Sequence, residues 1–264
     1  MIRAMDPRLA LTRAFVKRDL ASRYKNSVLG WLWLLGQPLL QLALYSFVFG
    51  LILRTRWGIT NPSGEEVPFG LILFSGILLH GVLAETLTRG PGLILGYPAY
   101  VKRVVFPLEI IPLSSAIGAT WLCTVGMALL LVAHLMVVQT AHLSWLLIPV
   151  PLAMVFLMAL ALAQLLGALG VFFRDLAQLS SHLSTIALFT APICFPSNIV
   201  PEGYRWLFQI NPLTVPVETL HELLFAGTLP PIMPIVAHIA ATLIMLLITR
   251  WIFNRLRAGF ADAV

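Results

Sequence analysis

Long apolar runs without charged residues recur along this chain, and they constrain its fold more than any other feature. From Ile110 to Phe173 there is no Asp, Glu, Lys or Arg. A helix needs about 20 apolar residues to cross a bilayer, so this one stretch has room for two crossings. With 59% hydrophobic and 11% charged residues, the composition also differs from that of soluble domains. We therefore expect an all-α integral membrane protein.

Turn residues and charges divide the apolar runs into six expected spans. The polar segment 139–144 is the only break between Ile110 and Phe173, and we place a turn there. Pro38 lies inside the first span and is expected to kink it. The sequence predicts six transmembrane helices, at about 26–53, 67–84, 110–138, 145–173, 176–195 and 232–249.

The distribution of Lys and Arg predicts the orientation. Six spans put both termini on one side, and of the 17 Lys and Arg residues only Arg54, Arg56 and Arg205 fall on the other side. Cytoplasmic loops are enriched in Lys and Arg. We therefore expect a multi-pass protein with both termini and the loop at about 90–109 in the cytoplasm. The net charge of +6 then reflects topology, and no nucleic-acid partner is expected.

Two segments outside the spans have patterns of their own. Residues 1–27 interleave basic and apolar residues, which is typical of a cytoplasmic amphipathic helix at the membrane interface, although a simple positive anchor fits as well. Residues 28–264 would then form a transmembrane domain of six spans. The external segment 196–231 has two apolar clusters separated by Asn211-Pro212, each too short to cross. A re-entrant helix pair between spans five and six fits this pattern best.

Motifs for catalysis or ATP binding do not occur in the sequence. His221-Glu222-Leu223-Leu224-Phe225 has phenylalanine where a zinc protease needs its second histidine, and neither a GxxxxGK[ST] loop nor a GxSxG elbow is present. The two cysteines, Cys123 and Cys194, lie in apolar segments and are interpreted as small buried residues. We expect a transporter subunit rather than an enzyme, with no cofactor on this chain. The energy for its work must come from elsewhere, and a cytoplasmic ATPase partner would need a docking surface on this chain.

Small residues recur at four-residue spacing in the fourth span. Ala159, Ala163 and Gly167 would form one face of a helix, which suits close helix packing, although chance in an alanine-rich span explains the spacing equally well.

Several motifs in order resemble one family. The chain reads RYKNSVLGWLW from Arg23, then Gln37-Pro38-Leu39-Leu40 and Tyr45-Ser46-Phe47-Val48-Phe49. Further matches are FPLEIIP at 106–112, FFRDL at 172–176, API at 191–193 and NPL at 211–213. Together they resemble permease subunits of bacterial ABC-type polysaccharide exporters, over nearly the whole chain. The opening looks closer to O-antigen and teichoic-acid exporters than to the group-two capsule branch.

The resemblance implies a permease homodimer in the bacterial inner membrane, paired with two P-loop ATPase subunits that would bind ATP and Mg. The dimer would move a lipid-linked polysaccharide from cytoplasm to periplasm. Residues matching the ATPase-docking segments are Arg13, Lys17, Arg18, Arg23, Gly96, Tyr97, Pro98, Tyr100, Lys102 and Arg103. Aromatic residues matching the substrate channel, each of which could instead face lipid, are Trp31, Trp33, Tyr45, Phe47, Phe49, Phe189 and Phe195.

Two other functions stay open at this point. A permease of the same superfamily could expel drugs or small lipids. An intramembrane enzyme acting on polyprenyl-linked sugars would need acidic or histidine side chains near the membrane surface, and Glu218, His221 and Glu222 would be its best site.

Overall fold

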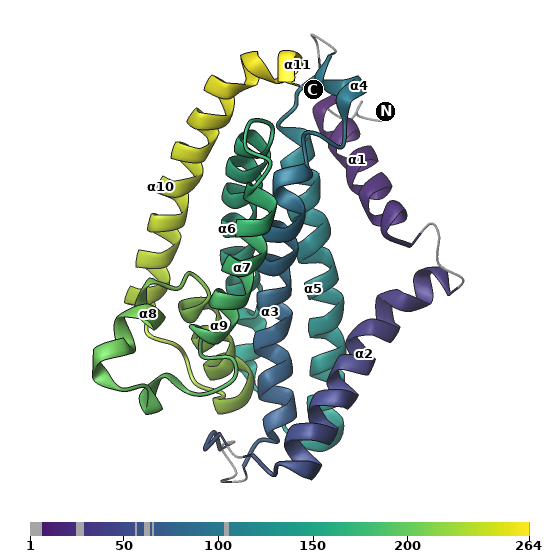
Figure 1. Cartoon of the computed structure of the whole chain (residues 1–264). Coiled ribbons are helices and arrows are strands. Elements are labelled where there is room, and N and C mark those ends of the chain that lie inside the picture. The colour runs from purple at the N-terminus through teal and green to yellow at the C-terminus, as the bar shows by residue number, and fades with distance from the viewer. Residues whose placement is uncertain are drawn as a thin grey trace, which may run out of the picture.

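A computed structural model describes residues 7–24, 29–55, 57–60, 64, 66–102 and 106–263. Helix α3 (Phe69–Arg89) lies at the centre of the bundle, with α5 (Ile110–Val137) and α6 (Pro149–Gly170) against it (Figure 1). In the described part of the chain, five helices are long and apolar enough to span a membrane. Of these, α3 is the most buried: 72% of the residues in its most apolar stretch are buried. The apolar sequence of α3 is thus explained by packing against protein on most sides.

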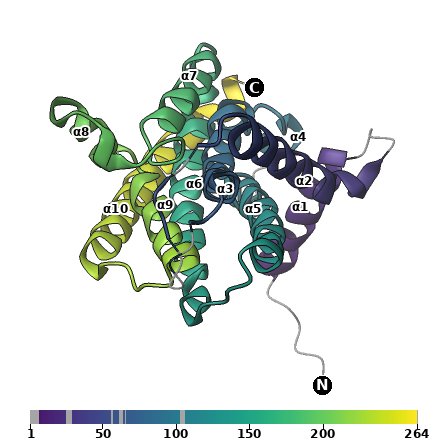
Figure 2. The ribbon, with the colours of Figure 1, turned by 90° about the horizontal axis from the view of Figure 1, so that it is seen from below.

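The first span differs from the other long helices because none of its residues is buried. It consists of a 3-10 turn (Gly30–Leu32), α2 (Trp33–Tyr45) and a π-helical segment (Ser46–Ile52). Seen from the end of the bundle, α2 lies beside α3 and α5 (Figure 2). The π-helical segment approaches α3 at Gly70, where a Cβ atom would lie 2.8 Å from the Cα of Ser46.

The remaining elements surround this centre. Helix α7 (Leu176–Phe189) packs on α3, and α10 (Ile232–Leu256) packs on α6. Between them, α8 (Arg205–Ile210) is largely exposed, while α9 (Thr214–His221) and the π turn Glu222–Ala226 bury Leu220, Leu223 and Phe225 completely. Short 3-10 turns lie at Gly90–Gly92, Leu143–Leu147, Ser197–Ile199, Glu202–Tyr204 and Arg257–Gly259.

Both ends of the described chain lie at the same end of the bundle. Helix α1 (Pro7–Tyr24) packs against the end of α5, close to α4 (Pro98–Val101) and α11 (Phe260–Ala263) (Figure 1). Arg257 donates a hydrogen bond to the carbonyl of Phe106 (3.0 Å), and Arg250 pairs with Glu109 (3.8 Å). These contacts join the end of α10 to the segment before α5.

Five of the six expected spans coincide with long helices, and they differ from those helices at their ends. The second was expected to end at about residue 84, but α3 continues through Glu85 and Arg89, because these charges pair with each other and with α1 rather than with water. The sixth was expected to end at 249, but α10 continues to Leu256. The fifth corresponds to α7, whose 14 residues fall short of the roughly 20 needed to cross a bilayer. It is therefore absent from the five candidate spans.

The small-residue face of the fourth span is used for close packing. Ala159 and Ala163 are completely buried, and a Cβ atom on Gly167 would lie 3.8 Å from the carbonyl oxygen of Gly90. One turn further on, a Cβ atom on Gly170 would lie 2.0 Å from the carbonyl oxygen of Pro91. The chain after α3 therefore lies directly on the backbone of α6.

Candidate functional site

An aromatic cluster joins α1 to the α4 segment at the end of the bundle where both termini lie. Phe15 of α1 contacts Tyr97, Tyr100 and Phe106, with ring centroids 6.1, 5.2 and 5.2 Å away. The guanidinium of Arg18 lies 4.2 Å from the Phe15 centroid, 4.8 Å from that of Tyr97 and 5.1 Å from that of Tyr100. Its Nη1 also donates a hydrogen bond to the Tyr100 hydroxyl (2.9 Å). Such cation–π contacts are typically more favourable with Arg than with Lys.

The aromatic cluster brings together the two docking segments expected from the sequence. Arg18 comes from the basic N-terminal segment, and Tyr97 and Tyr100 come from the loop after the second span. Other expected docking residues are exposed on the same elements, namely Arg13, Lys17, Gly96, Pro98 and Lys102. Arg103 lies outside the described residues, as does the junction at 25–28 between the N-terminal segment and the first span.

Arg23, by contrast, points into the protein. It belongs to a closed ring of alternating charges, Asp19 and Arg23 on α1 with Glu85 and Arg89 on α3, which we call the charge ring. Nη2 of Arg23 lies 2.8 Å from Asp19 Oδ2 and 2.5 Å from Glu85 Oε1, and Arg89 lies 2.6 Å from Asp19 Oδ1 and 2.8 Å from Glu85 Oε1. Burial alone lowers the pKa of Arg23, but its hydrogen bonds and charge pairing with Glu85 and Asp19 outweigh burial and raise that pKa above its ordinary value.

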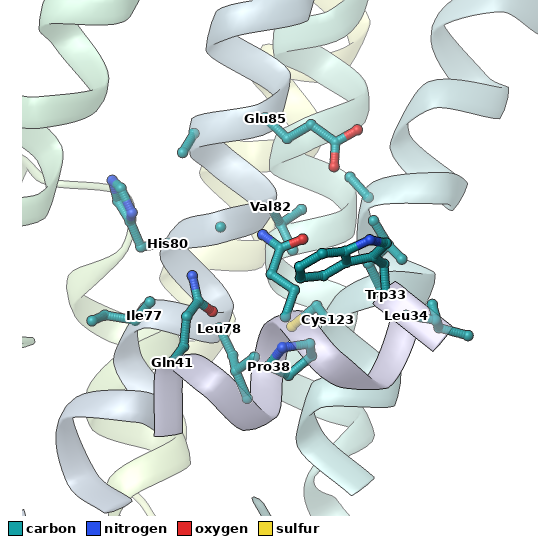
Figure 3. Close-up of a pocket in the computed structure, with 15 residues that line it drawn as sticks. Trp33, Leu34, Pro38, Gln41, Ile77, Leu78, His80, Val82, Glu85 and Cys123 are labelled. Carbon is teal, nitrogen blue, oxygen red and sulfur yellow. The ribbon is translucent and has the colours of Figure 1, made fainter. Parts of the chain in front are cut away.

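A groove runs between α2 and α3 next to the charge ring. It has a volume of about 290 Å³, and its polar lining comes from Trp33, Gln37, Gln41, His80 and Glu85. Figure 3 shows the Trp33 ring near the Glu85 carboxylate, with Gln41 and Pro38 further along α2. Gln37 and Gln41 are four residues apart and therefore share one face of α2. The groove thus offers an aromatic ring and amides beside a membrane-spanning helix, while the Glu85 carboxylate at its edge is held by Arg23 and Arg89.

The aromatic residues expected in the channel have different environments. Trp31, Trp33, Phe47 and Phe189 are exposed, whereas Tyr45 and Phe49 are half-buried against the core. Phe49 contacts Phe69 (5.3 Å between centroids), and Phe195 contacts Phe208 (5.7 Å). Of the seven, only Trp33 lines the groove.

Helix α7 exposes a polar face that the sequence reasoning missed. Gln178, Ser181, His182 and Thr185 are all exposed, and their spacing of three, four and seven residues places them on one side of the helix. The signal that could have found them is this helical spacing of polar residues inside an expected span. Helix α7 is also tied to the groove, since a ring nitrogen of His80 lies 3.0 Å from the carbonyl oxygen of Ser184.

In the best candidate enzyme site, the histidine is explained by its packing inside the protein. Glu218, His221 and Glu222 do line one pocket, together with Trp57 and Ser197. His221 is buried, lies 3.1 Å from the hydroxyl of Ser75, and contacts the Trp57 ring edge-on. Burial raises the pKa of Glu218, which the hydrogen bond from Ser197 partly opposes. In the described part of the chain, no three His, Cys, Asp or Glu side chains are grouped to bind a metal ion.

Comparison with known proteins identifies the family. Residues 10–225 match the model of the ABC-2 type transporter family. The chain belongs to this family. It is 30% identical over 249 residues to the O-antigen export system permease protein RfbA of Klebsiella pneumoniae, covering 93% of this chain and 91% of that protein. A protein of the same name from Myxococcus xanthus is 27% identical over 269 residues, covering 100% of this chain and 99% of its own length.

Membership in the ABC-2 family confirms the resemblance to exporter permeases that the sequence motifs predicted. It also relates the aromatic cluster and the groove to the work of one transporter. An ABC-2 permease is a multi-pass membrane subunit that works with an ATPase component, so a surface for that component and a path for cargo are both needed. The aromatic cluster and the groove are the candidates for these two roles.

Proposed function

We propose that this chain is the membrane-spanning subunit of an ATP-driven exporter that moves a lipid-linked polysaccharide, O-antigen in particular, from cytoplasm to periplasm. Two copies would form the channel, and two copies of a P-loop ATPase would bind ATP and Mg in the cytoplasm. The observation that carries the proposal is the groove beside α2, lined by Trp33, Gln37 and Gln41, together with the exposed polar face of α7. The relatives named for O-antigen export support this cargo.

The chemistry of a glycan fits this lining. Sugar rings have apolar C–H faces that stack on aromatic rings, and hydroxyl groups that bond to amides. Exposed amides are costly against lipid and favourable beside a hydrated polar cargo. Gln37 and Gln41 on α2 and Gln178 and Ser181 on α7 therefore support a hydrated path rather than a surface in contact with lipid.

The proposed topology has six crossings in the bacterial inner membrane, with both termini cytoplasmic. Helix α7 with the following residues up to 196 would form the fifth crossing, since α1 and α11 lie at the same end of the bundle (Figure 1). The segment with α8 and α9 would enter from the periplasm and return to it. Its burial pattern supports this arrangement, because α9 is packed against α3 and α6 while α8 is exposed.

The experiment that tests the function is reconstitution with the partner ATPase. The chain is expressed with a candidate P-loop ATPase from the same organism, purified, and placed in vesicles with lipid-linked O-antigen precursor. We expect co-purification and ATP-dependent transfer of glycan across the vesicle membrane. Glycan transfer without the partner would contradict the proposal. Transport of a small amphiphile in place of glycan would instead assign the chain as an efflux permease.

Charge reversal at Lys102 is expected to weaken coupling to the ATPase. Lys102 is exposed directly after α4, next to the aromatic cluster. If it faces an acidic surface of the partner, Lys102→Glu places like charges together, and the affinity of the two proteins should fall by about tenfold or more. The measurement is the binding of the purified ATPase at two salt concentrations. Arg174→Glu, an exposed charge reversal between α6 and α7, is the control, and equal losses in both variants would argue against a docking role for Lys102.

A further inference from the structure

The charge ring connects three helices that are distant in sequence. Each carboxylate contacts both arginines: Asp19 meets Arg23 within α1 and Arg89 across to α3, and Glu85 meets Arg89 within α3 and Arg23 across to α1. Helix α5 closes the third side at Gly118, where a Cβ atom would lie 2.8 Å from both Arg23 Nη2 and Asp19 Oδ2. The side chain of Asp19 is 4% exposed and that of Arg23 12% exposed.

This geometry makes the link between α1 and α3 stiff. The two cross-helix ion pairs are at hydrogen-bond distance, and separating the helices would leave charged groups buried without partners. Arg89 also donates to both oxygens of Asp19, at 2.6 and 3.5 Å, which fixes the orientation of this carboxylate. A displacement of α1 should therefore be transmitted to α3 through the charge ring rather than absorbed by side-chain rearrangement.

The two ends of this link lie at the two candidate functional features. One residue before Asp19, Arg18 lies in the aromatic cluster with Tyr97 and Tyr100. On the other side of the charge ring, Glu85 also lines the groove between α2 and α3. Helix α1 thus contributes Arg18 to the docking surface and, five residues later, contacts the groove-lining Glu85 through Arg23.

From this arrangement we infer that Asp19, Arg23, Glu85 and Arg89 are positioning residues that couple movement of the docking surface to the shape of the groove. The inference rests on the proposed function, in which an ATPase drives the permease from the cytoplasmic end. When the partner displaces α1, the charge ring moves Glu85 and the end of α3, and the groove changes beside α2. The charge ring contacts no cargo in this role.

A replacement that keeps the packing but removes the charges separates coupling from stability. An apolar pair of similar volume often replaces a buried ion pair without loss of stability. We expect the double variant Arg23→Met/Glu85→Met to assemble with the ATPase and hydrolyse ATP at nearly the wild-type rate, while glycan export per ATP falls at least fivefold. Unchanged export per ATP in this variant would overturn the inference.

A conservative variant covers the case in which the double variant does not fold. Glu85→Asp keeps the charge and retracts the carboxylate by one methylene, so that the link lengthens while the pair persists. We expect a partial loss of export per ATP at normal assembly. If this variant exports as much per ATP as the wild type, the inference fails even without data from the double variant.

A readout that does not depend on the cargo keeps this inference distinct from the proposed function. An environment-sensitive fluorophore is attached at Leu40→Cys on the exposed face of α2, with Cys123 and Cys194 replaced by alanine. ATP binding by the partner is expected to shift its emission in the otherwise wild-type complex, and Arg23→Met/Glu85→Met is expected to abolish that shift. If the double variant abolishes the emission shift but the wild-type complex moves no glycan, the cargo assignment fails and the coupling role of the charge ring stands. If the wild-type complex moves glycan and the double variant still shows the emission shift, the coupling role is overturned.

Discussion

Gly170→Ala is expected to destabilise the bundle by about 1–3 kcal/mol, or more if the backbone cannot adjust. The added Cβ atom would lie 2.0 Å from the carbonyl oxygen of Pro91 and 2.6 Å from its carbonyl carbon, far inside contact distance. Helix propensity favours alanine over glycine by about 1 kcal/mol, but this gain is smaller than the cost of separating two backbones. The measurement is the temperature at which the detergent-solubilised protein loses its monodisperse elution peak.

Gly81→Ala is the matched control for this variant. Gly81 lies in the middle of α3, and no heavy atom would lie within 4 Å of its added Cβ. We expect Gly81→Ala to retain or slightly increase thermal stability, because only the propensity term acts. Equal midpoints for the two variants would contradict the close packing of the Gly90–Gly92 turn on α6.

Trp33→Ala combined with Gln41→Leu is expected to reduce glycan export by on the order of tenfold, which corresponds to about 1.4 kcal/mol. Trp33 supplies the aromatic face of the groove, and Gln41 supplies an amide from the same helix. Because no residue of the first span is buried, the loss of these side chains removes little packing. The initial rate of glycan transfer in vesicles at saturating ATP is the measurement.

Trp251→Ala is the control for the groove variant. Trp251 is 62% exposed on α10, a helix that packs on α6 rather than beside the groove. A variant at this position removes an aromatic ring of the same size from the membrane-facing surface. We expect export near the wild-type rate, and a loss equal to that of the groove variant would show that exposed aromatic rings act through lipid contact.

The positions of the long helices could be predicted from hydropathy, since a membrane crossing requires a sustained apolar run. The ends of these helices could not be predicted in this way. Hydropathy places the end of the second span at Glu85 and Arg89, yet both residues lie within α3, because Arg23 and Asp19 of α1 neutralise them. Pairing between segments 70 residues apart is not visible in the hydropathy of either one.

The candidate site shows the same limit. The motifs pointed to the basic N-terminal segment and the loop after α3 as neighbours in function, and the structure places Arg18 among Tyr97 and Tyr100. The sequence could not distinguish Arg18 from Arg23, since both are arginines on one short basic helix. One lies over aromatic rings at the surface, and the other is an ion-pair partner inside the protein.

The absence of burial along the first span has a consequence for the width of the path. The first span has no buried residue, and its half-buried contacts with the core include Leu42, Tyr45 and Phe49, so moving it outward uncovers less apolar area than moving α3 would. Helices α3, α5 and α6 would stay together, because the buried residues of their shared core lie outside the first span. If the proposed function holds, a sugar unit wider than the groove would pass by displacing this one helix outward while the rest of the bundle stays in place.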